Sequence, residues 1–509
     1  MNPVRARRTS NVAGVKRISQ AALIAVLVAT ATGCTRPADT PVAVVEGKAA
    51  REFAGQLHDA VTPDAMVGHL AKLQEIADAH AGTRAVGTPG YEASVDYVVD
   101  VLRTRGFDVQ TPEFQTRVFE SGDPVLTVGG TAVKAHELQF SAGTSPDGVT
   151  GPLVAAPADG TPGCAPVDYK GLPVKDAVVL VDRGSCHFSE KQTIAARLGA
   201  AALIIADNVD EERMGGTLGG DTDVTIPVVS VSKADGARLR AEPGSVTLIL
   251  DATTKSVSAR NILAQTKTGS TQNVVMVGAH LDSVSECPGI NDNGSGVAAV
   301  LETAAQLGSE PAVRNAVRFA FWGAEEIGIV GSKKYIQSLT VEQLKDIALY
   351  LNFDMIGSPN PGYFTYDGDQ SADPGDESPP RVPEGSPGIE RTFVDYLKSL
   401  GKTAQDTGFD GRSDYDSFTK AGIPAGGLFS GAEAEMSPQQ AGLWGGTANE
   451  PFDPNYHKET DTFDRIDRTA LEINGGGVAW AVGIYAQDLD GRNGIPARED
   501  RIRRQIADR

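Results

Sequence analysis

Cysteine is scarce in this sequence, with 4 among 509 residues, so a dense disulfide framework cannot be what holds the fold together. Basic residues are also in deficit: 46 Lys and Arg stand against 66 Asp and Glu, which gives a formal net charge of −20. The sequence has no long basic run and no interleaving of basic with aromatic residues, which argues against a nucleic-acid partner. An acidic balance favours solubility, and it would also attract a cationic substrate such as a free amine.

The N-terminal apolar run, residues 21–31, is shorter than the roughly 20 residues that a membrane-spanning helix needs. A basic leader without acidic residues precedes it, so residues 1–33 are expected to form an export signal. Small residues then lead directly to Cys34, a pattern that resembles a bacterial lipoprotein processing site. A lipidated Cys34 would anchor the exported protein to a membrane. The alternative is a plain secretory signal with an incidental cysteine.

Composition and periodicity divide the rest of the chain into segments of different character. The first is rich in Ala, Pro and Thr without a sustained period, which is typical of a flexible tether. Helical spacing of apolar residues then leads into an α/β domain. A stretch with many short apolar runs interrupts that domain and indicates an inserted α/β domain with its own core. The expected divisions are the tether at residues 34–62, the first part of the main domain at 63–135, the insertion at 136–255, the rest of the main domain at 256–490, and a charged tail, solvated or a frayed helix, at 491–509.

The second part of the main domain alternates apolar strands with helices. This pattern predicts an α/β fold whose mixed, mostly parallel sheet is covered by helices on both faces. In such sheets, ligands bind beyond the carboxyl ends of the strands. A long loop rich in Gly, Pro and Asp at residues 358–388 is a candidate rim for such a site. The predicted strands are residues 273–277, 316–322, 348–353 and 426–429, and the predicted helices are residues 295–307, 341–347, 389–399 and 470–487.

Several of these strand ends carry a histidine or a carboxylate. Mixed nitrogen and oxygen donors of this kind suit Zn²⁺, and a shared carboxylate would hold two ions about 3.5–4 Å apart, as in two-metal hydrolases. Taken singly, each residue is more simply a solvated or hydrogen-bonded side chain. As a set at one sheet edge they predict a metal site. The candidate ligands are His280, Asp292, Glu326, Asp354 and His457.

Glu325 and Glu326 form a vicinal pair at a strand end, where neighbouring side chains can point to different sides. One can hold a metal while the other takes a proton from the attacking water. The segments that carry these residues are GAHLDSV (278–284), PGINDNGSG (288–296), FWGAEEIGIVGS (321–332), NFDMIG (352–357) and YHKETDT (456–462). Together they resemble the secreted bacterial leucyl-aminopeptidase family of di-zinc exopeptidases, relatives of glutamate carboxypeptidase II and the transferrin receptor.

This resemblance implies a zinc-exopeptidase fold of the phosphorylase/hydrolase type and cleavage of peptides that have a free N-terminus. It implies two zinc ions per subunit, with His280 and Asp354 on one ion, Glu326 and His457 on the other, and Asp292 bridging both. The further roles that it implies are Glu325 as general base, Asp282 as the residue that orients the imidazole of His280, and Tyr456 as a donor to the tetrahedral oxyanion. It also implies a cis peptide bond between Asp292 and Asn293.

The insertion resembles a protease-associated domain through DRGSCHFSEK (182–191) and AARLGAAALIIADN (195–208). Cys164 and Cys186 lie in this segment and could form a disulfide in an oxidising compartment. Cys287, among the candidate ligands, is then a lone thiol. A small, partly buried residue is the simpler interpretation of Cys287 than a ligand or a nucleophile.

Three other functions remain open at this stage. A carboxypeptidase or dipeptidase of the same fold would need a basic residue for the substrate carboxylate, and Arg412 is the candidate. A glutaminyl cyclase would use a single zinc, against which the complete ligand set argues. A non-catalytic receptor would be expected to lose ligands and the base, whereas this sequence retains them. The sequence does not determine the oligomeric state.

Overall fold

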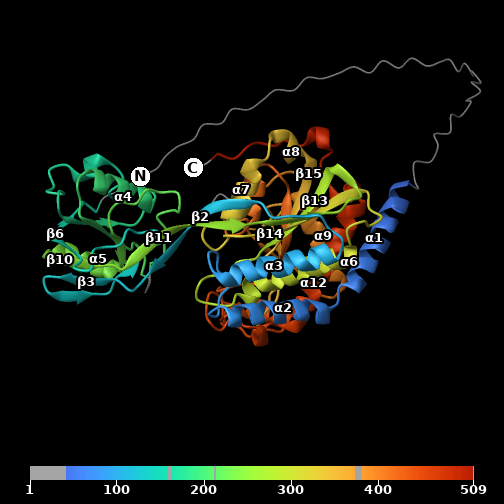
Figure 1. The fold of residues 1–509 in the computed structure, drawn as a ribbon, viewed down its shortest axis with the longest axis horizontal. Coiled ribbons are helices and arrows are strands. Elements are labelled where there is room, and N and C mark those ends of the chain that lie inside the picture. The colour runs from blue at the N-terminus through green and yellow to red at the C-terminus, as the bar shows by residue number, and fades with distance from the viewer. Residues whose placement is uncertain (1–41, 159–161, 211–213, 373–380, 508–509) are drawn as a thin grey trace, which may run out of the picture. The chain divides into compact units, whose positions relative to one another are not determined.

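The computed structural model describes residues 42–158, 162–210, 214–372 and 381–507 (Figure 1). The expected export signal and Cys34 lie outside these residues. Among the helices of the described residues, none combines the length and the apolar character needed to cross a bilayer.

The main sheet positions the candidate site. Within the described residues it has eight strands, in the order β1-β12-β14-β13-β15-β18-β16-β17. The central strands β14, β13, β15 and β18 run parallel to one another, while β12 and β16 pair antiparallel with their neighbours β14 and β18. The prediction of a mixed, mostly parallel sheet is confirmed. The strands are β1 (Val109–Gln110), β12 (Ile262–Gln265), β13 (Ser270–His280), β14 (Asn315–Trp322), β15 (Ile347–Phe353), β16 (Phe364–Tyr366), β17 (Gln405–Thr407) and β18 (Ala425–Phe429).

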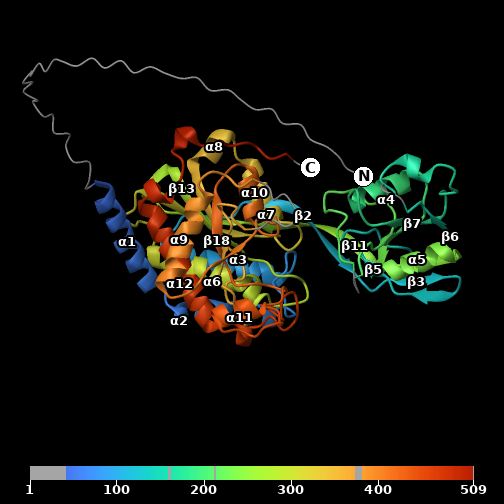
Figure 2. The ribbon, with the colours of Figure 1, turned by 180° about the vertical axis from the view of Figure 1, so that it is seen from behind.

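Helices cover both faces of this sheet (Figures 1 and 2). Val275 and Val277 of β13 pack into a core shared with α2, α3, α6, α9 and α12, whereas Met276 between them packs toward α7, α8 and α10. This alternation explains why the central strands read as nearly continuous apolar runs rather than as half-polar ones. The helices are α2 (Pro63–Ala79), α3 (Pro89–Thr104), α6 (Gly296–Leu307), α7 (Val330–Ser338), α8 (Val341–Asp346), α9 (Ser386–Ser399), α10 (Tyr415–Lys420), α11 (Pro438–Trp444) and α12 (Arg468–Gln487).

The expected tether is wrong over most of its length, because residues Val42–Ala60 form helix α1. Ala50, Ala54 and Leu57 of this helix are buried. A Cβ atom at Gly483 of α12 would lie 2.5 Å from the Cα of Ala54, so the two helices approach at a point where only glycine fits. Alanine is only weakly hydrophobic, so a helix face made largely of alanine differs little from the opposite face. The helical spacing of buried residues in α1 was therefore not evident in the sequence.

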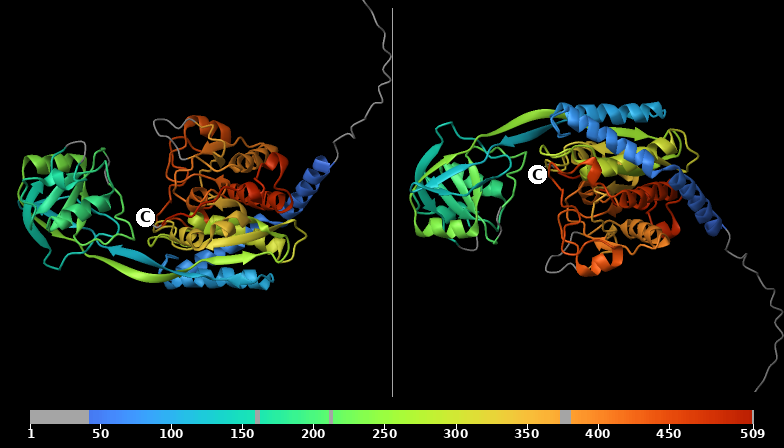
Figure 3. Two further views of the ribbon diagram at one scale, coloured as in Figure 1. Left: turned by 90° about the horizontal axis from the view of Figure 1, so that it is seen from above. Right: turned by 90° about the horizontal axis from the view of Figure 1, so that it is seen from below.

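The second sheet belongs to the insertion, and in the described residues it has eight strands in the order β4-β3-β10-β6-β7-β8-β9-β5. Its strands β3 and β4 precede residue 136, so this sheet begins earlier in the chain than the expected insertion. The antiparallel ribbon of β2 and β11 leads into and out of it (Figure 3). The elements are β2 (Glu113–Ser121), β3 (Val125–Val128), β4 (Thr131–Val133), β5 (His136–Glu137), β6 (Val149–Ala155), β7 (Val178–Asp182), α4 (Phe188–Arg197), β8 (Ala202–Ala206), β9 (Val228–Val231), α5 (Lys233–Ala241), β10 (Ser245–Ile249) and β11 (Ala252–Arg260).

The cysteines behave as the sequence suggested. Cys164 and Cys186 form a disulfide within the insertion, which confirms the predicted pair. Cys287 is a free, buried thiol. Burial raises the pKa of Cys287, which makes the thiol a poor nucleophile.

The expected solvated tail is also wrong, because its described part is docked against the main domain. Arg501 and Arg503 are buried. Arg501 donates to the backbone oxygens of Gln272 and Lys345, and Arg503 donates to those of Leu344, Gly422 and Ile347. A guanidinium group offers several donors to carbonyl groups at helix and strand ends, so a charged segment can pack without being solvated.

Candidate active site

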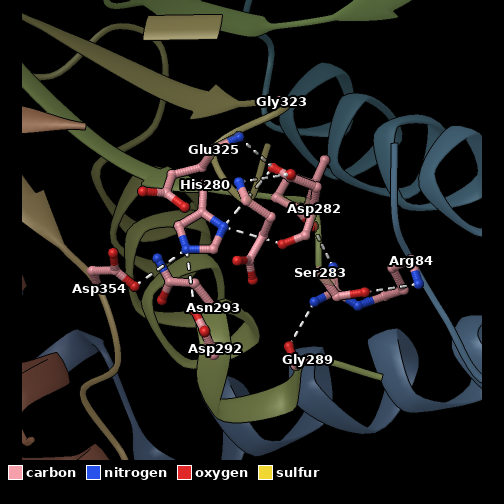
Figure 4. A network of polar contacts seen from close by, with 12 residues as sticks. Arg84, His280, Asp282, Ser283, Gly289, Asp292, Asn293, Gly323, Glu325 and Asp354 are labelled. Atoms are coloured by element: carbon pink, nitrogen blue, oxygen red, sulfur yellow. Dashed lines mark hydrogen bonds and ion pairs between the residues drawn. The ribbon is translucent and has the colours of Figure 1, made fainter. Parts of the chain in front are cut away.

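The candidate ligands meet at the carboxyl edge of the central strands, and Figure 4 shows three of them, His280, Asp292 and Asp354. His280 is the last residue of β13, Glu325 and Glu326 follow β14, and Asp354 follows β15. Asp292 comes from the helical turn η2 (Ile290–Ser295), which leads into α6. His457 lies in the chain segment before α12. Parallel strands end at the same edge, so residues far apart in the sequence are brought together there.

Asp292 lies between the two imidazoles. One of its carboxylate oxygens is 3.2 Å from Nε2 of His280, and the other is 3.2 Å from Nε2 of His457. The same nitrogen of His280 lies 3.2 Å from Oδ1 of Asp354, and that of His457 lies 3.1 Å from Oε2 of Glu326. The structure therefore brings the five candidate ligands together, in two groups on either side of the Asp292 carboxylate.

The electrostatics of these groups indicate a site with an excess of negative charge. Burial alone would lower the pKa of His280, but the carboxylates of Asp354 and Asp292 raise it well above its usual range. Burial is likewise outweighed at His457, where hydrogen bonds to Asp292 and Glu326 raise the pKa to about 10. Burial and the charge of Asp292 raise the pKa of Glu326 to about 7. These imidazole and carboxyl groups therefore bind protons tightly, and a bound cation would take the place of those protons.

These side chains fit a divalent zinc site. Glu326 Oε1 is buried, and among the described residues it has no hydrogen-bond partner, although a buried carboxylate oxygen normally has one. His280, Asp292 and Glu326 each offer a ligand atom within 4.8 Å of the others'. Imidazole nitrogen combined with carboxylate oxygen is a donor set that zinc accepts.

Asp282 contacts both the His280 imidazole and the chain that carries the vicinal glutamates. Nδ1 of His280 lies 3.0 Å from the backbone oxygen of Asp282, and it is 3.8 Å from the Asp282 carboxylate. That carboxylate accepts hydrogen bonds from the backbone N–H groups of Glu325 and Glu326, at 3.2 and 3.3 Å. Asp282 therefore fixes the chain that carries the vicinal glutamates, while its backbone carbonyl orients the imidazole.

Three supporting residues were missed by the sequence reasoning. The Asp461 carboxylate accepts the backbone N–H groups of Asn291 and Asp292, at 2.8 and 3.0 Å. Asp453 accepts from the Asn291 side chain at 2.6 Å, and Ser413 donates to Oδ2 of Asp354 at 2.6 Å. Asp461 stands in the motif YHKETDT, and Ser413 directly follows Arg412. In the sequence, only this closeness to candidate site residues indicated that they could support the site.

The backbone is constrained around the site. Ala324, Met355 and His457 adopt φ values of 62°, 54° and 56°, in the left-handed region that non-glycine residues rarely occupy. Each adjoins or is a candidate site residue, which is where such conformations tend to be retained. The peptide bond between Asp292 and Asn293 is cis, as the resemblance implied.

A cavity of about 410 Å³ opens beside the candidate ligands, and Glu325 and Tyr456 line it. Tyr456 stacks on His457 with ring centroids 3.9 Å apart. Its hydroxyl accepts a hydrogen bond from Arg412 Nη2 at 3.2 Å, and Arg412 Nη1 lies 2.9 Å from Glu433. Phe364, Tyr366, Phe429 and Phe452 add aromatic surface to the wall.

Comparison with known proteins agrees with this geometry. The family model described as peptidase family M28 matches residues 261–482, and the PA domain model matches residues 149–239. A protein of Mycobacterium tuberculosis named probable lipoprotein aminopeptidase LpqL is 66% identical over 489 residues, which cover 96% of this chain and 98% of that protein. The chain belongs to peptidase family M28. The M28 peptidase is a hydrolase, and its inserted domain is a PA domain, as the sequence predicted.

Two solved aminopeptidase structures share the fold. An aminopeptidase from Aneurinibacillus sp. strain AM-1 is similar with a TM-score of 0.68 and 26% identity, covering 84% of this chain and 95% of that one. BSAP, a zinc aminopeptidase from Bacillus subtilis, is similar with a TM-score of 0.60 and 26% identity, covering 86% and 98% of the two chains.

Proposed function

We propose that this M28 peptidase is an aminopeptidase that binds two zinc ions and removes the N-terminal residue of peptides. The observation that carries the proposal is the position of Asp292, whose two carboxylate oxygens each lie 3.2 Å from a different imidazole. A carboxylate held in this way suits a bridge between two cations. In the proposed assignment His280 and Asp354 hold one zinc and Glu326 and His457 the other.

The chemistry is divided among the remaining side chains. Zinc ions held by these ligands would polarise the scissile carbonyl and lower the pKa of the attacking water. Glu325 takes the proton from that water and delivers it to the leaving amine. Burial raises the pKa of Glu325 well above its usual range, which suits a group that must both accept and return a proton. The Tyr456 hydroxyl, oriented by Arg412, donates to the oxyanion.

The charge of the cavity favours a free N-terminus over a free C-terminus. Carboxylates line it beside the candidate ligands, including Asp410, Glu433 and Glu435. Arg412, which a carboxypeptidase would need for the substrate carboxylate, is instead engaged by Glu433 and Tyr456. This pairing supports aminopeptidase over carboxypeptidase or dipeptidase activity.

The proposed location is the outer face of a membrane. The leader, the small residues before Cys34, and the name of the similar mycobacterial protein support an exported lipoprotein anchored at Cys34. Mass spectrometry of membrane-extracted protein tests this. A diacylated Cys34 at the mature N-terminus is expected, and an N-terminus formed beyond Cys34 would contradict it.

One assay tests the activity. Amino-acid p-nitroanilides, their N-acetylated counterparts and C-terminal analogues are incubated with the enzyme, with and without a chelator. We expect cleavage of the free-amine substrates only, loss with chelator, and recovery with added zinc. Cleavage confined to blocked substrates would overturn the proposal.

A further inference from the structure

The loop between His280 and Asp292 joins ligands that the proposed function assigns to the two zinc sites. No strand or helix forms between β13 and η2, and the hydrogen bonds of β14 and η2 reach residues 281–289 at the two ends: the Leu281 N–H donates to the Trp322 oxygen, and the Gly289 oxygen accepts from the Gly294 N–H. Leu281, Cys287 and Pro288 are nevertheless buried. Some other group must therefore satisfy the backbone of this loop.

Arg84, from the segment between α2 and α3, supplies those contacts (Figure 4). Its side chain is fully buried, at 0% exposure. Nε donates to the backbone oxygen of Pro288 at 2.8 Å, Nη2 donates to that of Gly289 at 2.6 Å, and Nη1 donates to that of Leu281. One guanidinium group thus ties the start of the loop to its end.

The backbone of Arg84 adds a further tie. Its N–H donates to Ser283 Oγ at 3.0 Å, and that hydroxyl lies 3.0 Å from the backbone oxygen of Cys287, to which it donates. Gly289 has φ +65°, and a Cβ atom there would lie 2.5 Å from Ser283 Cβ and 2.4 Å from the backbone oxygen of Asp292. The turn that presents Asp292 is thus packed directly against the residues that Arg84 holds.

The charge of Arg84 is also placed toward the metal site. Among the described residues, its guanidinium is bonded to backbone oxygens and to no carboxylate. Burial lowers the pKa of Arg84, and the carboxylates of Asp461, Asp282 and Asp292 offset part of that effect by favouring the charged form. A buried arginine without a carboxylate partner is costly, so its position calls for a reason.

We propose that Arg84 is a positioning residue for the metal centre, which sets the distance between His280 and Asp292 by clamping the loop that connects them. A lysine keeps the charge but is a point donor on a flexible stem, and it cannot satisfy carbonyl groups at Leu281, Pro288 and Gly289 together. Arg84→Lys therefore relaxes the loop. Residues that support metal ligands typically alter metal affinity about 10- to 100-fold when they are changed.

The test compares Arg84→Lys with Arg503→Lys in the full chain. Arg503 is a matched control because it is also buried, at 9% exposure, and donates to the backbone oxygens of Leu344, Gly422 and Ile347. It lies at the amino end of β15, whereas the candidate ligands lie at the carboxyl ends. Zinc affinity is measured by competition with a chromophoric chelator. Visible absorption of bound Co²⁺ reports ligand geometry, and urea unfolding in EDTA reports stability without metal.

We expect Arg84→Lys to weaken zinc binding at least about tenfold and to change the Co²⁺ spectrum. Arg503→Lys should reduce stability in EDTA but leave both metal readouts unchanged. Wild-type zinc affinity in Arg84→Lys, or an equal loss in Arg503→Lys, would overturn the proposal. If Arg84→Lys does not fold, Ser283→Ala takes its place with the same criteria, because it removes the acceptor of the Arg84 N–H. Failure of the wild-type chain to bind zinc would instead refute the proposed function.

Discussion

Replacing Glu325 by glutamine separates proton transfer from metal binding. The amide has nearly the shape of the carboxylate, and Asp282 still accepts the backbone N–H groups of residues 325 and 326, so the strand end is retained. Glutamine cannot take a proton from water. The neighbouring carboxylates are already engaged: Glu326 with His457, and Glu433 with Arg412. Without this base, kcat should fall by the usual factor for loss of a general base, about 10²- to 10⁴-fold, or about 3–5 kcal/mol.

The assay combines turnover of leucine p-nitroanilide with zinc content after dialysis. Glu325→Gln should retain zinc and KM while losing kcat, which is the pattern of an interaction made in the transition state. Glu326→Gln is the adjacent control, and it should lose zinc together with activity. A Glu325→Gln enzyme that keeps its zinc and turns over within about tenfold of wild type would refute the assignment of the base.

The remaining predictions address the metal, the C-terminal segment and the carboxyl group of Glu390. Asp292→Ala should abolish binding of both zinc ions, because it removes the shared carboxylate; zinc content by atomic absorption checks this. Zinc affinity should decrease as pH falls, because the metal must displace a proton from His457, whose pKa is raised, against the cost of burial, to about 10 by Asp292 and Glu326. Chelator competition at about pH 6 and 8 would measure this, and a flat profile would contradict it. Deleting residues 497–509 should reduce the free energy of unfolding by about 2–4 kcal/mol, because buried carbonyl groups lose their arginine donors; urea unfolding checks this. Burial and nearby aspartates raise the pKa of Glu390 to about 7, so the folded state binds that proton more tightly than the unfolded chain. Stability is then lost as pH rises from about 4.5 to about 7. Glu390→Gln should therefore raise the free energy of unfolding by about 1 kcal/mol at about pH 8, after allowance for solvent screening, and should leave it unchanged at about pH 4. Urea unfolding at both values, without divalent cations, would show this, and an equal effect at both would contradict it.

The central sheet was predictable because the apolar runs indicated parallel strands, and the candidate ligands followed those strands at their carboxyl ends. Apolar runs at the positions of β13, β14 and β15 were each followed by a residue with a strong donor atom, and parallel strands place such residues together. His280, Glu326 and Asp354 therefore needed only the fold class to be assigned to one site. His457 and Asp292 do not follow a strand directly; their residue types made them candidate ligands, and the division of the ligands between two zinc ions depended on the family resemblance.

What the sequence did not reveal depends on contacts between distant segments. Helix α1 packs through Ala50 and Ala54, whose small side chains give little hydrophobic contrast and matter only because Gly483 lies opposite. Arg503 is indistinguishable in sequence from the exposed arginines around it, since its carbonyl acceptors come from other elements. Such residues are identified by their partners, and no local pattern reports a partner far away in the chain.

The metal ligands were easier to identify from the sequence than the residues that hold them in place. A metal ligand must be one of a few residue types at a strand end or a tight turn, so its chemistry is visible in the sequence. The supporting groups act through hydrogen bonds that many residue types can make. Asp461 bonds the backbone of Asp292, and Arg84 bonds the loop that begins one residue after His280. Because the bonds of Arg84 come from a segment far before His280 in the sequence, geometry at the metal should respond to a change far from the ligands along the chain.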